Sequence, residues 1–267
     1  MGIDYIIDYA CEPKQALGVG GIMGRLKGRD RAEAVIELYR GQGDMRSPAQ
    51  MGFEMVRRTP EGDEETEVII VQSLLDAAEE LLPWEPHCAT CPANRIGAPF
   101  GCIGAINYPI SEEGERWLLD QLPTNEHPLP YMLLQSAIRE LGYSGADASP
   151  LRAEPGMFFD APEPLERNLE AVRVNGDQVC ELLFLSGPIM PAHGSMLLQF
   201  FGAVSQDLDA DVIMKLADPP SEEWIQAELP FQMTLVPGED VAIRAFKQFF
   251  RALHIAFRLR ASVLLDV

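Results

Sequence analysis

The chain has 267 residues, of which 47% are hydrophobic and 23% charged, and its formal net charge at pH 7 is −20. This composition is typical of a globular protein that buries a sizeable core. The charge argues against a nucleic acid partner, because DNA- and RNA-binding proteins need a basic surface that neutralises phosphates.

The acidic charge is concentrated in the middle of the sequence. Residues 59–165 carry four basic and nineteen acidic side chains, whereas residues 1–58 carry nine basic and eight acidic ones. No apolar run reaches the roughly 18 residues of a membrane-spanning helix, and the N-terminus lacks the basic segment and apolar core of a secretory signal. We expect a cytoplasmic protein with no membrane partner, whose thiols stay reduced unless they bind metal or act in redox chemistry.

The first predicted elements are a strand, a loop and a helix. Residues 3–10 are rich in Ile and Tyr and alternate loosely, which is typical of a strand. Residues 17–28 are glycine-rich and basic, and we expect a loop there. Asp30 followed by Glu33 matches the capping-box pattern and predicts a helix over residues 31–40.

A hairpin, a helix and a long loop follow. Residues 52–58 and 66–72 are predicted to be two strands joined by a turn at Thr59–Asp63. A helix is expected over 74–82. Residues 83–110 show no apolar periodicity and contain many Pro and Gly residues, so they are expected to form a long irregular loop.

In the second half of the chain, capping residues and turn signals predict several short elements. Ser111 is a typical N-cap for a helix. Asn175-Gly176 accepts the positive φ angles of a tight hairpin turn, so residues 169–174 and 178–185 are expected to pair. We further expect, in chain order, helices over 112–121, 128–141, 194–206 and 239–262, and short strands over 211–217 and 229–236.

Together these elements predict a fold of the α+β class in a single domain over residues 1–267. Small mixed sheets, with hairpins near 52–72 and 169–185, are expected to pack against several helices. A long C-terminal helix and an irregular loop rich in Cys, Pro and Gly complete the predicted architecture.

The cysteines are the strongest chemical signal in the sequence. Cys88 and Cys91 form a C-x-x-C pair, the usual half-site for zinc, and Cys102 follows between two glycines. We favour Cys11 as the fourth ligand, because it follows a predicted strand end where a side chain can leave the sheet and meet a loop. Cys180 lies in an apolar stretch and is expected to be a buried small hydrophobe. The other candidate ligands are His87, His127 and His193.

A bound metal would also order the long irregular loop, since structureless loops of that length are uncommon in compact domains. It would define a metal-ordered subdomain over residues 83–127. The leading hypothesis is therefore a metal-binding protein with a structural zinc site and a binding or scaffolding role. The alternatives are an iron–sulfur cluster, a redox-active Cys88–Cys91 thiol pair, and thiols that bind no metal.

A second candidate site is the glycine-rich stretch Gly18–Gly24, which resembles a phosphate-binding loop. Met23 stands where the dinucleotide pattern needs glycine, and no Gly-Lys-Ser/Thr sequence is present, so neither phosphate-loop pattern is complete. Lys14, Arg25 and Lys27 flank the stretch and would hold an anionic ligand, as in an enzyme that acts on a small anion. A solvated loop is the alternative.

The predicted C-terminal helix carries a basic face. Its basic residues recur at spacings of three and four, and so share one side of the helix. This face is either solvated or docked on the acidic middle third of the sequence, within the chain or across a homo-oligomer. The basic residues are Arg244, Lys247, Arg251, His254 and Arg258, and the core-facing residues are Ala242, Phe246, Phe249, Leu253 and Phe257.

Overall fold

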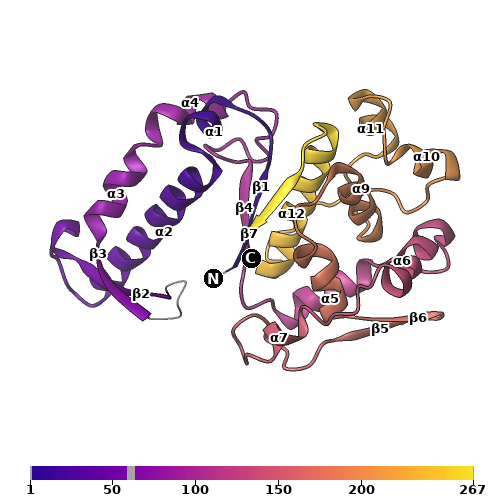
Figure 1. Ribbon diagram of the computed structural model, residues 1–267, viewed down its shortest axis with the longest axis horizontal. Coiled ribbons are helices and arrows are strands. Elements are labelled where there is room, and N and C mark those ends of the chain that lie inside the picture. The colour runs from indigo at the N-terminus through magenta and orange to yellow at the C-terminus, as the bar shows by residue number, and fades with distance from the viewer. Residues whose placement is uncertain (1, 59–63, 267) are drawn as a thin grey trace. The chain divides into compact units, whose positions relative to one another are not determined.

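The structure, a computed structural model, describes residues 2–58 and 64–266 (Figure 1). It is a mixed α/β protein, 49% helical and 14% strand, in which small sheets pack against several helices, so the predicted fold class is confirmed. The chain divides into two compact units: Met1–Tyr9 with Pro92–Val267, and Ala10–Cys91. The single domain and the metal-ordered subdomain stay predictions, and the turn expected at Thr59–Asp63 lies outside the described residues.

The first unit is built on a three-stranded antiparallel sheet of order β4-β1-β7. The central strand β1 (Gly2–Ile7) confirms the strand predicted at the N-terminus. Its consecutive residues Tyr5, Ile6 and Ile7 are each at most 1% exposed, so both faces of the strand are covered. The edge strands are β4 (Ile103–Asn107) and β7 (Val263–Asp266).

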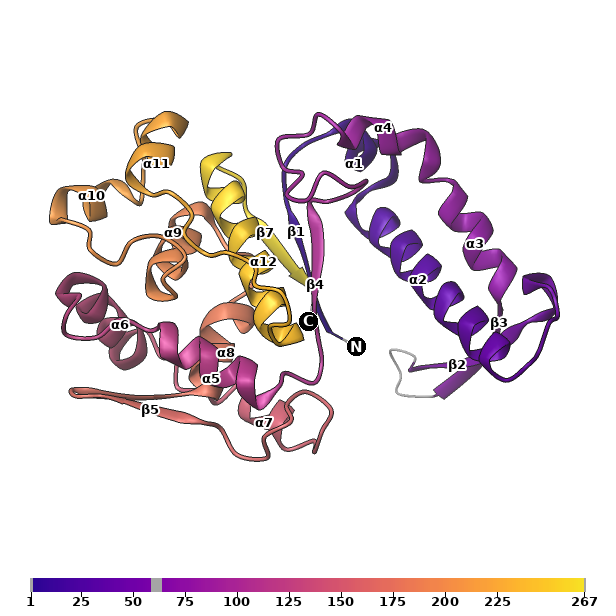
Figure 2. The same ribbon diagram turned by 180° about the vertical axis from the view of Figure 1, so that it is seen from behind.

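Helix α12 (Val241–Arg258) packs on this sheet and confirms the long C-terminal helix (Figure 2). The side chain of Asp240 caps it by accepting hydrogen bonds from the amides of Ala242 and Ile243. Tyr5 of β1 meets Phe249 edge to face, with ring centroids 5.1 Å apart. The fully buried phenylalanines of the helix are Phe246, Phe249, Phe250 and Phe257.

The remaining elements of the first unit surround this core. The helix predicted from Ser111 is confirmed, since the Ser111 hydroxyl accepts a hydrogen bond from the Gly114 amide at 3.0 Å. The elements are α5 (Glu112–Gln121), α6 (Pro128–Glu140), α7 (Ser149–Arg152), β5 (Glu166–Leu169), β6 (Val172–Asn175), α8 (Gly176–Cys180), a π-helix (Glu181–Leu185), α9 (Pro191–Phe200), α10 (Ala210–Lys215) and α11 (Glu222–Glu228).

The hairpin predicted around Asn175-Gly176 is wrong. Strands β5 and β6 do pair antiparallel, but both lie before Gly176. Asn175 is the last residue of β6 and does not join two strands. The Asn175 side chain accepts from the Gln178 amide and the Gln178 side chain accepts from the Asn175 amide, so the segment forms a capping box that starts α8. Residues 178–185, predicted as a strand, are therefore helical.

Gly176 is needed for space and not for a positive φ angle. A Cβ atom at this position would lie 1.7 Å from Oε1 of Glu115. Glu115 and Asp177 both pair with Arg152, and the three side chains are at most 8% exposed. Burial raises the pKa of Glu115, and the guanidinium of Arg152 opposes this. The Arg152 guanidinium also lies 3.9 Å from the centre of the Phe159 ring. A buried ionic triad of this kind fixes the geometry of the segments that it joins.

Two strand predictions near the C-terminal helix are also wrong. Residues 211–217 lie mostly in helix α10, whose start is capped by the Asp209 side chain. Residues 229–236 form no helix or strand. One strand was not predicted: β4 lies inside residues 83–110, where only a loop was expected.

The second unit holds two long helices and a hairpin. Strands β2 (Gly52–Arg58) and β3 (Glu64–Ile70) pair antiparallel and confirm the first predicted hairpin. A small core of Ala32, Met51 and Val71 joins this hairpin to the helices. The helices are α1 (Glu12–Leu17), α2 (Val19–Gly41), α3 (Val71–Glu79) and α4 (Glu85–Cys88), with single 3-10 turns at Pro48–Gln50 and Leu82–Trp84.

The predicted glycine-rich loop is wrong, because α2 begins at Val19 and runs through Gly20, Gly21, Gly24 and Gly28. Only Gly18, with φ 68°, breaks the chain between α1 and α2. A glycine inside a helix costs about 1 kcal/mol relative to alanine. Packing offsets this cost: a Cβ atom at Gly28 would already lie 3.6 Å from Leu74 of α3. Within the described residues, no helix combines the length and apolar character that crossing a membrane requires.

His254 of α12 generates a pH prediction. The ring is 5% exposed, and its Nε2 donates to the Leu229 carbonyl at 2.8 Å. Burial lowers the pKa of His254 from its usual 6.5 to about 4, and Arg258 and Arg251 act in the same direction. Between these two pKa values His254 binds a proton in the unfolded chain but not in the folded chain. The contribution of the neutral, buried His254 to stability is therefore present above the unfolded pKa and is lost as the pH falls.

We expect the free energy of unfolding of the wild type to lose about 2 kcal/mol more than that of His254→Gln between about pH 7 and pH 5. Urea unfolding at a series of pH values measures this difference. Equal pH dependence in the two proteins would contradict the assignment of a buried neutral His254.

Candidate functional site

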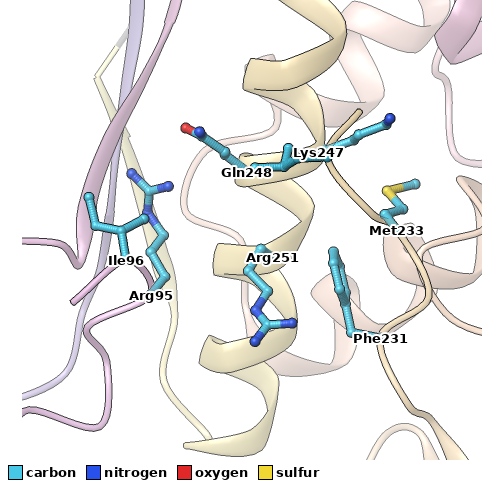
Figure 3. Close-up of a pocket in the computed structure, with 8 residues that line it drawn as sticks. Arg95, Ile96, Phe231, Met233, Lys247, Gln248 and Arg251 are labelled. Atoms are coloured by element: carbon cyan, nitrogen blue, oxygen red, sulfur yellow. The ribbon is translucent and has the colours of Figure 1, made fainter. Parts of the chain in front are cut away.

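A cavity of about 210 Å³ opens in the first unit, where α12 faces an extended segment and a loop (Figure 3). The extended segment is residues 231–235, and the loop contributes residues 95–96. The lining residues are Arg95, Ile96, Phe231, Met233, Leu235, Lys247, Gln248 and Arg251. We refer to this cavity as the cationic pocket, because three of its residues are basic in a chain of net charge −20.

Arg95 is held rigidly at the wall of the pocket. Its Nη2 donates to the Ile103 carbonyl at 2.6 Å, and its guanidinium carbon lies 5.2 Å from the centre of the Tyr5 ring. Gly104 leaves the room for this arrangement, since a Cβ atom there would lie 2.4 Å from both Nη2 of Arg95 and Oη of Tyr5. Burial raises the pKa of Tyr5 to about 12, so the phenol stays neutral beside the arginine.

The Nε atom of Arg95 is buried and has no hydrogen-bond partner among the described residues. A buried donor without an acceptor costs roughly 1–3 kcal/mol, and more when the group is charged. Arg95 lines the pocket with a guanidinium that makes no ion pair with a carboxylate of the described residues. A guanidinium is a strong hydrogen-bond donor to carboxylate and phosphate oxygens.

The loop that carries Arg95 is ordered by side-chain hydrogen bonds. Oδ1 of Asn94 accepts from the Gly97 amide at 2.9 Å, and its Nδ2 donates to the Ala98 carbonyl at 3.0 Å. The Arg95 amide donates to the Gly101 carbonyl at 3.3 Å. These hydrogen bonds hold part of the loop over residues 83–110, the loop that a bound metal was predicted to order.

Arg251 is the second cation that faces the pocket. Its guanidinium carbon lies 5.1 Å from the centre of the Phe231 ring, and it makes no ion pair with the described residues. Lys247 is different, because it pairs with Glu239 and both side chains are at most 12% exposed. The pocket therefore keeps two uncompensated positive charges, those of Arg95 and Arg251.

The rest of the basic face of α12 is occupied within the chain. Arg258 pairs with Glu222, and His254 bonds to the Leu229 carbonyl. The basic face is therefore partly paired within the chain. Its acidic partners are Glu239 and Glu222, which lie outside the acidic middle third predicted to dock on it, and Arg244 and Arg251 are exposed. A homo-oligomer through this face stays a prediction, and Lys247 and Arg258 already have intramolecular partners.

Apolar side chains form the remaining walls. Phe231, Met233 and Leu235 alternate with polar residues and all three line the pocket. Ile96 and Leu235 are 56% and 55% exposed, so apolar surface extends from the pocket to solvent. A cationic centre with apolar walls is the usual composition of a site for a small organic anion.

The predicted metal ligands fall in both units. Cys11 precedes α1, Cys88 ends α4, and Cys91 follows in the same unit, whereas Cys102 precedes β4 in the other. Cys88, Cys102 and Cys180 are buried, and no disulfide joins the five cysteines. Among the residues that the structure describes, no group of three or more His, Cys, Asp or Glu side chains is placed to hold a metal ion. The cysteine metal site stays a prediction from the sequence.

Of the three histidines named as further ligand candidates, His87 and His127 contact carboxylates, and Nε2 of His193 is buried without a hydrogen-bond partner among the described residues. Nδ1 of His87 lies 3.1 Å from Oε2 of Glu12. Nδ1 of His127 lies 2.9 Å from Oδ1 of Asp207. Burial lowers the pKa of His193.

The predicted anion site at Lys14, Arg25 and Lys27 has lost its structural basis, since these residues lie on α1 and α2 and not around a loop. Arg25 pairs with Glu80 at 2.5 Å and donates to the Gly21 carbonyl at 2.9 Å. Anion binding by these three residues stays a prediction.

The residues of the cationic pocket were not predicted as a site. One available signal was Arg95, a single basic residue in a stretch of Pro and Gly within the most acidic third of the chain. The other was the alternation of Phe231, Met233 and Leu235, which was interpreted as a strand. The alternation is real, but it places one side of an irregular segment against the pocket.

The chain matches no protein-family model, no curated protein and no solved structure. Its function is therefore inferred from the side chains themselves.

The sequence predicts about one zinc per chain, which should be lost in Cys91→Ser and Cys11→Ser and retained in Cys180→Ala. Elemental analysis with an absorbance spectrum, on protein purified without a metal-affinity tag, measures this. Iron with visible absorbance would indicate an iron–sulfur cluster instead. Metal below stoichiometric amounts in the wild type would contradict the metal prediction.

Proposed function

We propose that this protein binds a small organic anion, with a carboxylate or phosphate group and an apolar part, in the cationic pocket. The observation that carries the proposal is the pair of arginines, Arg95 and Arg251, that reach the pocket from different elements and lack an anionic partner among the described residues. In a protein with 41 acidic residues, two arginines that line one cavity without a carboxylate partner give a local positive potential that attracts an anion.

Two features of the arginines favour anion binding. The guanidinium of Arg95 is fixed by Ile103 and Tyr5, so little side-chain entropy is lost when a ligand binds. Guanidinium groups present planar pairs of donors that match carboxylate and phosphate oxygens. The Lys247–Glu239 pair closes one wall without adding net charge.

The apolar walls define the rest of the ligand. Phe231, Met233 and Leu235 offer a surface on which a ring or short hydrocarbon group can pack. Burial of apolar surface stabilises a complex by about 25 cal/mol per Å². Inorganic anions cannot use this surface, so an organic anion should bind more tightly than phosphate alone.

The lining residues support binding more than catalysis. They include no Ser, Cys, His, Asp or Glu side chain, and their lysine is engaged with Glu239. General acid–base catalysis and nucleophilic catalysis both need such groups within hydrogen-bond reach of the reacting atoms.

The hypotheses drawn from the cysteines remain alternatives of a different class. They are a zinc-dependent scaffold and an iron–sulfur or thiol redox protein. Elemental analysis tests the zinc and the iron–sulfur hypotheses. A cytoplasmic location and the lack of a nucleic acid partner stay expectations from the composition.

Arg251→Gln should weaken the binding of phenyl phosphate or benzoate by roughly tenfold or more, because one charge-assisted hydrogen bond contributes about 1.5–3 kcal/mol. Isothermal titration calorimetry measures the affinity, and comparison of the two probes identifies the preferred anionic group. Arg244→Gln is the matched control, since Arg244 is an exposed arginine on the same helix outside the pocket.

Added salt should weaken probe binding to the wild type, because it screens exposed charges. Benzyl alcohol, which has the ring without the charge, should bind far more weakly than either anion. Equal affinity of phenyl phosphate for the wild type and Arg251→Gln, or tight binding of benzyl alcohol, would overturn the proposal.

A further inference from the structure

Cys88 and Cys91 are held together in one turn of the second unit. Cys88 is the last residue of α4, and the Cys91 amide donates to the Cys88 carbonyl at 3.3 Å. A hydrogen bond from residue i+3 to residue i closes a turn whose end Cα atoms lie less than about 7 Å apart. A disulfide spans Cα separations of roughly 4.4–6.8 Å. The backbone therefore holds the two Cα atoms within the range that a disulfide can span.

The two thiols differ in their access to solvent. Cys91 is half-buried, whereas Cys88 is 8% exposed. Ala89 and Thr90, which lie between them, are exposed, so the turn is at the surface of its unit. A reagent from solvent therefore reaches the sulfur of Cys91 first, and the more buried Cys88 can then react with Cys91.

We propose that Cys88 and Cys91 form a reversible disulfide by exchange with a low-molecular-weight disulfide. In the first step the Cys91 thiolate attacks one sulfur of the reagent, forms a mixed disulfide and releases one thiolate. In the second step the Cys88 thiolate attacks the Cys91 sulfur and releases the other thiolate. Two protein thiols are thus oxidised, and one disulfide molecule is reduced to two thiols.

The arrangement defines a modification site and not a catalytic dithiol. Oxidoreductase thiols are activated at a helix N-terminus, where the dipole favours the thiolate. Cys88 lies at the C-terminal end of a four-residue helix, so it gains no such activation. The exchange should therefore proceed at the rate of ordinary thiols and should be reversed by a reductant.

Cys180 provides an internal standard of an unreactive thiol. It is 3% exposed, and burial raises its pKa to about 12. Few Cys180 thiolates exist at mildly alkaline pH, and the reagent cannot reach them. Cys180 should therefore keep its thiol, whereas Cys11, which is half-buried like Cys91, can react only as a single thiol if it has no cysteine beside it in its turn.

The test uses the full chain, reduced and treated with a chelator, and then incubated with oxidised glutathione at mildly alkaline pH. Acid quenching, alkylation of the remaining thiols after denaturation, and peptide mass mapping identify the products. We expect Cys88 and Cys91 both to lose their alkylatable thiols, to be joined by a bridge and to retain no glutathione on either residue.

Variants separate the two steps of the exchange. Cys88→Ser should trap glutathione on Cys91, Cys91→Ser should form no bridge, and Cys102→Ser should behave as the wild type. Each protein is checked for folding by circular dichroism. No reaction of the wild type, a mixed disulfide that stays open, or a bridge to another cysteine would overturn the proposal. Anion binding in the cationic pocket is measured separately, because none of its residues is a cysteine.

Discussion

The first unit depends on the packing of the phenylalanine face of α12 against the sheet. Each fully buried phenylalanine contributes about 1.5–3 kcal/mol, whereas an exposed ion pair contributes between about 0 and 1 kcal/mol. The apolar face therefore sets the position of the helix, and the charged face adapts to it. With Phe249 placed against Tyr5, the opposite side of the helix presents Lys247 and Arg251 to the segment that precedes it.

The same sheet also positions the other arginine of the pocket. Tyr5 is buried in the central strand, and Gly104 on β4 leaves room for Arg95 to lie over its ring. The guanidinium of Arg95 is thus held by Tyr5, and the position of Tyr5 is set by the packing of the core. Two cations from separate parts of the chain meet at one cavity as a consequence of core packing, although the chain as a whole is strongly acidic.

Much of the helical structure was predictable from local signals. The Ser111 cap, the bounds of α5 and the amphipathic C-terminal helix follow from side-chain chemistry within a few residues. The errors arose where a tertiary contact decides. The sequence around Gly176 indicates a tight turn. In the structure the missing side chain leaves space for Glu115, which lies 61 positions earlier in the chain. The glycines of α2 likewise indicated a loop, but they lie inside the helix, and one of them, Gly28, lies close to Leu74 of α3.

The candidate site was less predictable than the fold. The cysteine spacing drew attention because thiols are chemically distinctive, while Arg95 and Arg251 are 156 positions apart and have no shared motif. Only the pairing of β1 with β4 and the packing of α12 bring them to one cavity. The ion pairs could be identified only from the structure. Lys247 and Arg251 look equivalent in the sequence, but within the part of the chain that the structure describes only Lys247 pairs with an acidic residue.

The most direct test of the account is the response of the arginine Nε–Hε resonances to phenyl phosphate in an NMR titration. The account predicts that the resonances of Arg95 and Arg251 shift together and saturate, and that the resonance of Arg244 stays in place. Resonances of Arg95 and Arg251 that do not move, or that move no more than that of Arg244, would contradict the assignment of the cationic pocket as an anion site.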